Sequence, residues 1–167
     1  VLSLNNISEK GLVRFDKTAF NVSDALPQPD AILLRSFKLT PDHATEGLLA
    51  VGCAGAGVKY IPVHAYTDRG IVVFNTPGAN ANAVKELVVC GMLLSSRGII
   101  QGNIFSKTLS GQDSAELNKS MESQKKNFKG NELKGKTLGI IGLGAIGSLL
   151  AQTAEVMGMK IIGYDPY

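Results

Sequence analysis

One segment near the end of the sequence limits the possible fold more than any other feature. A short β-rich run, Thr137–Ile141, leads directly into the glycine-rich stretch Gly142-Leu143-Gly144-Ala145-Ile146-Gly147. A helical pattern follows over Ser148–Gly158, and a second β-rich run, Lys160–Tyr164, ends at Asp165. Strand, G-x-G-x-x-G turn, helix, strand and acidic residue, in this order, are typical of a βαβ unit that binds a dinucleotide.

The glycines of this motif have separate physical tasks. Gly142 permits the tight turn from strand to helix, Gly144 lets the backbone come close to a pyrophosphate, and Gly147 lets the helix pack tightly on the strand. The helix N-terminus presents free N–H groups and the positive end of its dipole to the phosphates. Asp165 follows Gly147 by 18 residues, close to the spacing of a carboxylate that binds the adenosine ribose hydroxyls. Because a carboxylate repels a 2′-phosphate, the motif predicts NAD rather than NADP.

Short apolar β-rich runs alternate with helical segments along the whole chain, which predicts an α/β fold with a parallel sheet. The runs are unbroken rather than alternating, so their strands are expected to be buried on both faces. A domain boundary is predicted at Thr76–Pro77, just before a long helix. The runs before this boundary are Val1–Leu4, Ala31–Leu34, Leu48–Gly52 and Ile71–Phe74.

The long helix is predicted over Ala83–Ile100 and is apolar almost all round, so it is expected to be buried between domains or subunits. The stretch Gly111–Lys136 is polar and Lys-rich, which predicts a surface segment of helix and loop. Cys53 and Cys90 lie in apolar runs and are predicted to be buried structural thiols. Because they form neither a C-x-x-C pattern nor a disulfide framework, they favour a cytoplasmic protein.

Composition excludes several classes of protein. The 167 residues are 44% hydrophobic and 19% charged, with a net charge of +3, which indicates a globular chain rather than a disordered one. The sequence contains no basic stripe with interleaved aromatic residues, which disfavours nucleic acid as a partner. It shows no secretory signature, and no apolar run reaches the roughly 18 residues of a membrane span. The chain starts at Val1 and ends at Tyr167, one residue after a proline, so both ends are expected to be cuts in a longer protein.

Motifs on both sides of the predicted boundary resemble those of one known family. The segment Leu133-Lys134-Gly135-Lys136-Thr137, together with the glycine-rich stretch that follows it, is similar to the D-2-hydroxyacid dehydrogenases. The segment Gly70–Pro77 and the loop Val51–Val58 resemble the same family. The resemblance covers nearly the whole chain from Ala31 onward. The motifs most similar to the phosphoglycerate dehydrogenase branch of the family are Leu34–Ser36, Pro77–Leu87 and Gly163–Tyr167.

The resemblance implies two domains and a reaction. Residues 1–76 would form the N-terminal part of a flavodoxin-like substrate domain, and residues 77–167 the first half of a Rossmann-type NAD-binding domain. NAD is the implied cofactor and a phosphorylated 2-hydroxy acid the implied small-molecule substrate, with no metal, nucleic acid or membrane as a partner. The complete enzyme would oxidise 3-phospho-D-glycerate to 3-phosphohydroxypyruvate, the first step of phosphorylated serine biosynthesis. It would be a homodimer or homotetramer, and the long helix would contribute to the subunit contact.

The resemblance also implies roles for particular residues. Arg35 would hold the substrate phosphate, since a guanidinium binds oxyanions in a bidentate way, with Ser36 and Lys38 beside it. Lys38 lies about one residue closer to Arg35 than the family spacing. Lys59 and Pro62 differ from the usual family residues, and neither is expected to take part in chemistry. The loop of Ala54, Gly55, Ala56 and Gly57 would bind the substrate carboxylate, and the implied cofactor-binding residues are Ala56, Gly142, Gly144, Ala145, Ile146, Gly147 and Asp165.

No catalytic residue is expected in this chain. The catalytic arginine, acidic residue and histidine of the family lie in the second half of the cofactor domain and just past it, after the last residue of this sequence. His43 and His64 match no catalytic position and are expected to be surface or packing residues. Glu86 is expected to stabilise its helix or to pack. By itself the chain is therefore expected to be inactive.

Three other interpretations stay open. The protein could be a D-2-hydroxyacid dehydrogenase that acts on an unphosphorylated acid such as lactate or glycerate. It could be an NAD-sensing relative without catalysis, because a fold does not determine a function, or only a structural piece of a longer chain. The cluster of Lys125, Lys126 and Lys129 is interpreted as a solvated basic face, with a contact to a neighbouring subunit's phosphate site as the alternative.

Overall fold

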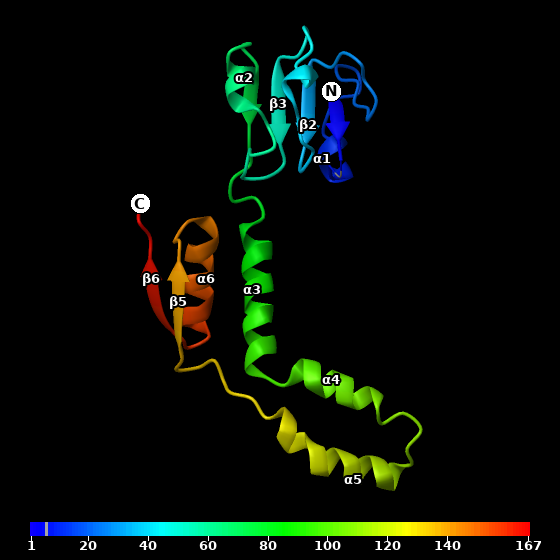
Figure 1. The fold of residues 1–167 in the computed structure, drawn as a ribbon, viewed down its shortest axis with the longest axis vertical. Helices are drawn as coiled ribbons and strands as arrows, with labels where there is room; N and C mark the ends of the chain where they lie inside the picture. Colours follow the sequence, from blue (N-terminus) through cyan, green and yellow to red (C-terminus); the bar gives the residue numbers. More distant parts are fainter. Residues whose placement is uncertain (6) are drawn as a thin grey trace. The chain divides into compact units, whose positions relative to one another are not determined.

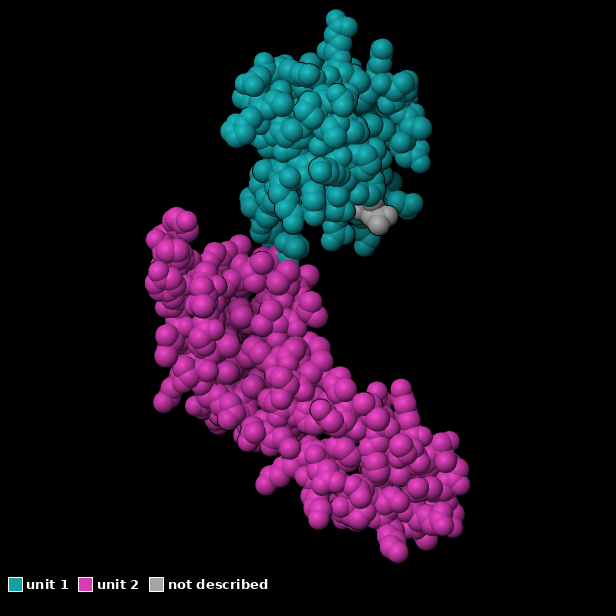
Figure 2. All heavy atoms as spheres, viewed as in Figure 1, with its two compact units in different colours: residues 1–80 teal, residues 81–167 magenta. Residues whose placement is uncertain are grey.

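The computed structural model describes residues 1–5 and 7–167, which divide into two compact units, unit 1 (residues 1–80) and unit 2 (residues 81–167) (Figure 2). The sequence places the domain boundary after residue 76. Each unit contains its own parallel sheet. No helix in the described ranges combines the length and the apolar character that crossing a membrane requires.

Unit 1 is built on a four-stranded parallel sheet (Figure 1). The strands are β1 (Leu2–Leu4), β2 (Ala31–Leu34), β3 (Ala50–Cys53) and β4 (Val72–Phe74), and the short helices are α1 (Glu9–Leu12), η1 (Pro41–His43) and α2 (Val63–Thr67). Neighbours in the sheet are also neighbours in the sequence, and each pair is parallel. All the strands therefore end at one edge of the sheet, where the loops that follow them come together.

Apolar side chains of the two central strands form the core of unit 1. Ile32 and Leu34 on β2 and Val51 and Cys53 on β3 are at most 3% exposed. Tyr66 of α2 is fully buried in the same cluster. Its hydroxyl donates a hydrogen bond to the carbonyl oxygen of residue 40 at 3.0 Å, and burial raises the pKa of the phenol. This buried and hydrogen-bonded ring anchors α2, which contacts β4.

The expectation that the strands are buried on both faces is wrong for unit 1. Buried residues alternate with half-buried ones along β2 and β3. On β4, Val72 and Phe74 are 51% and 60% exposed. The strand order explains the difference, because right-handed crossovers between strands in sequence order place every connection on the same face of the sheet. One face is therefore covered fully, and the other is not.

Unit 2 joins a helical first part to a small βαβ element. Its elements in chain order are α3 (Ala81–Ser96), α4 (Ile99–Lys107), α5 (Ser114–Gln124), η2 (Lys125–Phe128), β5 (Thr137–Ile141), α6 (Ala145–Val156) and β6 (Lys160–Tyr164). β5 and β6 pair in parallel. α6 packs on both strands and also contacts α3, so that helix, helix and sheet form layers (Figure 1). Ala154 and Leu150 of α6 and Ile140 of β5 are the buried side chains of this packing.

The prediction of one continuous helix over Ala83–Ile100 is wrong. α3 ends at Ser96, and a separate helix, α4, begins at Ile99. The break lies at Gly98, where a Cβ atom would come within 2.8 Å of the Cα of Phe128. A larger residue here would overlap the backbone of η2, so this close contact requires glycine.

Much of α3 is exposed in the single chain, so its predicted burial between subunits stays a prediction, whereas the predicted burial of Cys90 is wrong. Leu87 and Leu93 are 71% and 41% exposed, and the Cys90 thiol is exposed rather than buried. α3 packs mainly against α6, and an apolar sequence does not say which side of the helix makes that contact. Cys53 is buried, as predicted, and its Sγ lies 3.5 Å from the carbonyl oxygen of Gly57.

Most of the other predicted elements are confirmed, with strand limits that agree to within two residues. α6 begins at Ala145, directly after Gly144, and not at Ser148, which brings the helix N-terminus to the glycine motif. The polar stretch 111–136 contains α5, which Asp113 caps by accepting hydrogen bonds from two backbone N–H groups. Lys125, Lys126 and Lys129 are all exposed, and Lys125 forms an ion pair with Glu122.

Candidate functional site

The loops after the strands of unit 1 line an open cavity of about 500 Å³, here called the edge cavity. Ligands of parallel α/β sheets bind at the carboxyl ends of the strands, and this volume is in the usual range for a small-molecule site. Arg35 and Ser36 follow β2, and the glycine-rich loop follows β3. The lining residues are Ile7, Ser8, Arg35, Ser36, Ala54, Gly55, Gly57, Lys59, Tyr60, Thr76, Ala79 and Asn80.

Backbone N–H groups of the loop after β3 are available to a ligand. The N–H of Ala54 donates to the carbonyl oxygen of Leu34 at 2.7 Å and continues the sheet. Within the described part of the chain, the next three N–H groups, from Gly55 to Gly57, have no acceptor. Successive backbone N–H groups in a loop form a concave site for an anion. The loop can therefore bind a carboxylate without a charged side chain.

Asn5 fixes the loop that carries Arg35. It directly follows β1, and its side-chain Oδ1 accepts hydrogen bonds from the backbone N–H groups of Arg35 at 3.2 Å and Ser36 at 3.4 Å. Its φ of 45° lies in the left-handed region, which asparagine adopts more readily than most residues. These bonds hold the backbone of Arg35 in place, and its side chain is exposed.

Asn75 and Thr76, which follow β4, hold the glycine-rich loop from the other side. The Asn75 amide donates to the carbonyl oxygen of Ala56 at 2.8 Å. The Thr76 N–H donates to the carbonyl oxygen of Gly55 at 2.9 Å, and its hydroxyl donates to that of Cys53 at 3.3 Å. These bonds occupy the carbonyl groups of the loop and leave its N–H groups free, which favours an anion as the ligand.

The glycine motif of unit 2 has the geometry that a dinucleotide needs. Gly142 has a φ of 89°, which favours glycine strongly. A Cβ atom on Gly147 would overlap the carbonyl oxygen of Gly142, so this position has no room for a side chain. A Cβ on Gly144 would meet nothing within 4 Å. Gly142 and Gly147 are therefore required by the fold itself, whereas Gly144 faces open space that a ligand can occupy.

The N-terminus of α6 presents unpaired donors beside that open space. The N–H of Ser148 donates to the carbonyl oxygen of Gly144 at 3.0 Å and closes the first turn of the helix. Among the described residues, no group accepts from the N–H groups of residues 144–147. Free N–H groups and the positive end of the helix dipole together favour a phosphate group.

Asp165 lies beside the same turn. One carboxylate oxygen accepts a hydrogen bond from the N–H of Leu143 at 2.6 Å, and the other accepts from the N–H of Tyr167 at 3.1 Å. These two bonds, the first above all, lower the pKa of Asp165. The carboxylate therefore stays charged to a lower pH than an ordinary aspartate, and it joins the end of β6 to the glycine motif.

Comparison with known proteins identifies the family. Residues 102–167 match the D-isomer specific 2-hydroxyacid dehydrogenase, NAD binding domain. The D-3-phosphoglycerate dehydrogenase of Methanocaldococcus jannaschii is 42% identical to this chain over 147 residues, which are 86% of the chain and 26% of that protein. Residues 102–167 belong to the NAD-binding domain of the D-2-hydroxyacid dehydrogenase family. The chain spans about a quarter of the length of this curated relative.

Two further proteins are similar to this chain. The hydroxypyruvate reductase of Thermotoga maritima is 40% identical over 144 residues, which cover 84% of this chain and 43% of that protein. The NAD⁺-bound crystal structure of 3-phosphoglycerate dehydrogenase from Entamoeba histolytica is 36% identical with a TM-score of 0.56, and the match covers 82% of this chain and 38% of that one. The predicted fold class, a flavodoxin-like domain followed by the first half of a Rossmann-type domain, and the predicted cofactor NAD are confirmed.

The structure brings most of the predicted substrate residues together in unit 1. Arg35 and Ser36 line the edge cavity with three residues of the loop after β3, whereas Lys38 and Ala56 do not line it. Lys59, to which the sequence assigns no part in chemistry, does line it. Asn5, Asn75 and Thr76, which hold the two loops, were not predicted as site residues. Their one signal is that each comes directly after, or one residue beyond, a parallel strand, where ligands of such sheets bind.

The two histidines lie away from the edge cavity. Nδ1 of His43 is 3.1 Å from the backbone nitrogen and 2.9 Å from the hydroxyl of Thr40, and the ring packs edge-on against Phe37. His64 lies on α2 and is exposed. Across residues 1–5 and 7–167, no group of three or more His, Cys, Asp or Glu side chains could hold a metal ion.

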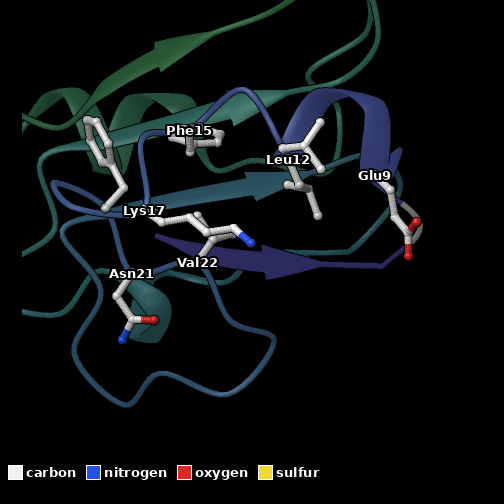
Figure 3. Close-up of a pocket in the computed structure, with 8 residues that line it drawn as sticks. Glu9, Leu12, Phe15, Lys17, Asn21 and Val22 are labelled. Atoms are coloured by element: carbon white, nitrogen blue, oxygen red, sulfur yellow. The ribbon is translucent and has the colours of Figure 1, made fainter.

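A second cavity of unit 1, of about 570 Å³, lies beside α1 and the chain that follows it (Figure 3). In this view Leu12, Phe15 and Val22 surround the same space, and Glu9 and Asn21 lie at opposite ends of it. None of the predicted site residues lines this mainly apolar cavity. The edge cavity is therefore the candidate substrate site. The residues that line the second cavity are Glu9, Leu12, Val13, Phe15, Lys17, Phe20, Asn21 and Val22.

Replacing Asn75 by alanine is expected to loosen the glycine-rich loop. The change removes the hydrogen bond to the carbonyl oxygen of Ala56 and should lower the free energy of unfolding by about 1 kcal/mol. Substrate KM in the complete protein should rise several-fold, because the N–H groups of the loop lose their fixed direction. The matched control is Asn127→Ala, which removes a side-chain hydrogen bond from the Asn127 amide to Gln124 in unit 2. This variant should leave KM unchanged. An unchanged KM in Asn75→Ala would contradict the role of this loop.

Replacing Asp165 by alanine is expected to weaken NAD binding by about tenfold or more, the effect of losing hydrogen bonds to a charged group. The preference for NAD over NADP should fall as well, because the negative charge that repels a 2′-phosphate is lost. Titration calorimetry with both dinucleotides measures the two effects. The exposed acidic residue Glu155 of α6 provides the control variant Glu155→Ala.

Because the pKa of Asp165 is lowered, the contribution of its charge to NAD binding should persist in mild acid. It should disappear only as the pH falls through that lowered pKa.

Proposed function

We propose that the complete protein oxidises 3-phospho-D-glycerate to 3-phosphohydroxypyruvate with NAD⁺, the first step of phosphorylated serine biosynthesis. The observation that carries the proposal is the edge cavity, in which the guanidinium of Arg35 and the free N–H groups of Gly55–Gly57 lie at one edge of the sheet. A substrate with one phosphate and one carboxylate fits these two kinds of anion site. The names and identities of the D-3-phosphoglycerate dehydrogenase relatives support the same substrate.

In this proposal the two anionic groups of the substrate bind to different loops. The carboxylate accepts hydrogen bonds from the N–H groups of Gly55–Gly57, and the phosphate pairs with Arg35 and the hydroxyl of Ser36. An arginine suits the second role, because its planar donors match phosphate oxygens in a bidentate way. Asn5 positions the Arg35 loop, and Asn75 positions the glycine-rich loop. Two separate anchors would fix the carbon atom between them, which carries the reacting hydroxyl.

The glycine motif would hold the adenosine half of NAD. The open space at Gly144 and the unpaired N–H groups of Ala145 and Ile146 fit a pyrophosphate, and Asp165 would accept hydrogen bonds from the ribose hydroxyls. When bound, NAD⁺ supplies the hydride acceptor for C2 of the substrate. The contribution of these residues is to bind and orient the cofactor. Ala56 is proposed to lie beside the nicotinamide, as the family resemblance implies.

We also propose that these 167 residues do not catalyse the reaction by themselves. None of them matches the family's catalytic arginine, acidic residue or histidine, and His43 is engaged with Thr40. In the complete protein a histidine would take the hydroxyl proton, with its pKa raised by a neighbouring carboxylate. An arginine would fix the carboxylate and the developing carbonyl group.

The exposed apolar side chains of α3 and α4 support a homodimer or homotetramer, which we propose to act in the cytoplasm. Leu87, Ile99, Ile100 and Ile104 are each at least 50% exposed in the single chain. Burial of such side chains against a second copy would remove apolar surface from water, which is the main source of subunit affinity. Light scattering of the complete protein tests the assembly, and a monomer at micromolar concentration would contradict it.

Steady-state kinetics with a panel of acids distinguishes the proposal from its alternatives. With NAD⁺ and the complete protein, kcat/KM should be highest for 3-phospho-D-glycerate and much lower for D-glycerate and D-lactate. The relative named hydroxypyruvate reductase favours the second candidate, a dehydrogenase of unphosphorylated acids, which predicts the reverse order. Binding of NAD without turnover of any acid would favour an NAD-sensing protein.

A further inference from the structure

The edge cavity has an excess of positive charge. Its lining includes two cations, Arg35 and Lys59, and no aspartate or glutamate. Within the described residues, neither the guanidinium of Arg35 nor the ammonium of Lys59 makes an ion pair or donates a hydrogen bond. The ammonium of Lys59 does contact an aromatic ring. Both charges are therefore available to a ligand in the cavity.

Lys59 is held at the end of the loop that carries the free N–H groups. It follows Gly57 by two residues, and its Nζ lies 4.9 Å from the centre of the Tyr60 ring, a distance at which a cation and an aromatic face attract. Tyr60 also lines the cavity, and its carbonyl oxygen accepts a hydrogen bond from the N–H of Leu39 at 2.9 Å. The hydrogen bond fixes the backbone next to Lys59, and the ring provides a contact for its ammonium beside the cavity.

Lys38 has a different position. The family resemblance suggests it as the cation that assists Arg35, but it does not line the edge cavity. Arg35 and Lys59 lie on the loops after β2 and β3, which are adjacent strands. Both residues line the edge cavity, so the two cations border the same ligand space.

We infer that Lys59 is a second phosphate-binding residue and determines the preference of this enzyme for phosphorylated over unphosphorylated acids. This inference rests on the proposed function for its substrate. A phosphate monoester carries close to two negative charges at neutral pH, which matches one guanidinium and one ammonium. An unphosphorylated acid has only its carboxylate, which the N–H groups of the glycine-rich loop can bind. Loss of Lys59 should therefore affect one class of substrate and spare the other.

Kinetics of Lys59→Ala in the complete protein test the inference. For 3-phospho-D-glycerate, kcat/KM should fall about tenfold, mainly through KM, the effect of losing one hydrogen bond to a charged group. For D-glycerate it should change by less than about twofold, as for an ordinary surface substitution. Lys59→Arg, which keeps the charge, should recover most of the loss. Lys17→Ala removes the same charge from the other cavity of unit 1 and should leave both substrates unaffected.

A binding measurement separates this inference from the proposed function. Inorganic phosphate is titrated into the complete protein, and the amide signals of Gly55–Gly57 and Arg35 are followed by NMR. Phosphate should shift them in the wild type, with an affinity about tenfold lower in Lys59→Ala. If the complete protein oxidises no phosphorylated acid, the proposed function fails. The phosphate affinities of the wild type and Lys59→Ala still support or overturn the role of Lys59 in that case. Equal losses for both acids, or phosphate affinity unchanged by Lys59→Ala, would overturn the inference.

Discussion

Gly147→Ala is expected to unfold unit 2, whereas Gly144→Ala is expected to leave it folded and block NAD. A Cβ on Gly147 would overlap the carbonyl oxygen of Gly142 and press against Ile140. Both neighbours belong to the close contact between α6 and β5, so relief requires a shift of backbone. The free energy of unfolding of unit 2 should fall by about 3 kcal/mol or more, at the upper end of overpacking effects.

The glycine three residues earlier provides the matched control. A Cβ on Gly144 meets no atom within 4 Å, and its φ of −65° suits alanine, so unfolding should change by less than about 1 kcal/mol. NAD affinity should nevertheless fall by about tenfold or more, because the new methyl group occupies the space proposed for the pyrophosphate. Native-state hydrogen exchange of α6 amides measures the stability of unit 2, and calorimetric titration measures NAD binding. Equal NAD affinity in Gly144→Ala and the wild type would place the dinucleotide elsewhere.

Arg35→Ala should lower kcat/KM for 3-phospho-D-glycerate by about 100-fold, the effect expected when a charge-assisted contact with a phosphate is lost. The backbone of this loop is held by Asn5 and not by the guanidinium, so the variant should fold normally. Its activity on an unphosphorylated acid should be almost unchanged.

Arg14→Ala is the control for Arg35. Arg14 is exposed, lies in unit 1 and lines neither of the two cavities described above. Thermal unfolding of both variants checks that each is folded before kinetics are compared. Normal activity of Arg35→Ala on the phosphorylated substrate would contradict the phosphoglycerate proposal and favour a dehydrogenase of simple hydroxy acids.

The glycine motif could be predicted from the sequence because its geometry is local. The tight turn at Gly142, the close contact at Gly147 and the position of Asp165 at the end of β6 all depend on one continuous βαβ segment. Each residue there has its role from neighbours within one strand, turn and helix. Pattern and spacing alone therefore describe the cofactor half well.

The edge cavity depends on contacts between distant parts of the sequence, and it could be predicted only in part. The bonds from Asn5 to the Arg35 loop and from Asn75 to Ala56 span 30 and 19 residues. No local pattern contains them. The sequence favoured Lys38 over Lys59 because no local pattern describes the path of the loop after Gly57. That path decides which lysine lines the cavity.

Burial was the least predictable property. An apolar strand looks the same in sequence whether one face or both faces are covered, and the strand order of unit 1 covers only one. An apolar helix such as α3 likewise does not reveal whether its partner lies in the same chain. The exposed Leu87 and Cys90 are consequences of this ambiguity.

Product analysis of one reaction tests the central claim most directly. The complete protein is incubated with NAD⁺ and 3-phospho-D-glycerate, and NADH and 3-phosphohydroxypyruvate are quantified together. The two products are expected to form in equal amounts, and D-glycerate in place of the phosphorylated acid should give far less NADH. Absence of NADH with 3-phospho-D-glycerate, or faster NADH formation with D-glycerate, would contradict the proposed function.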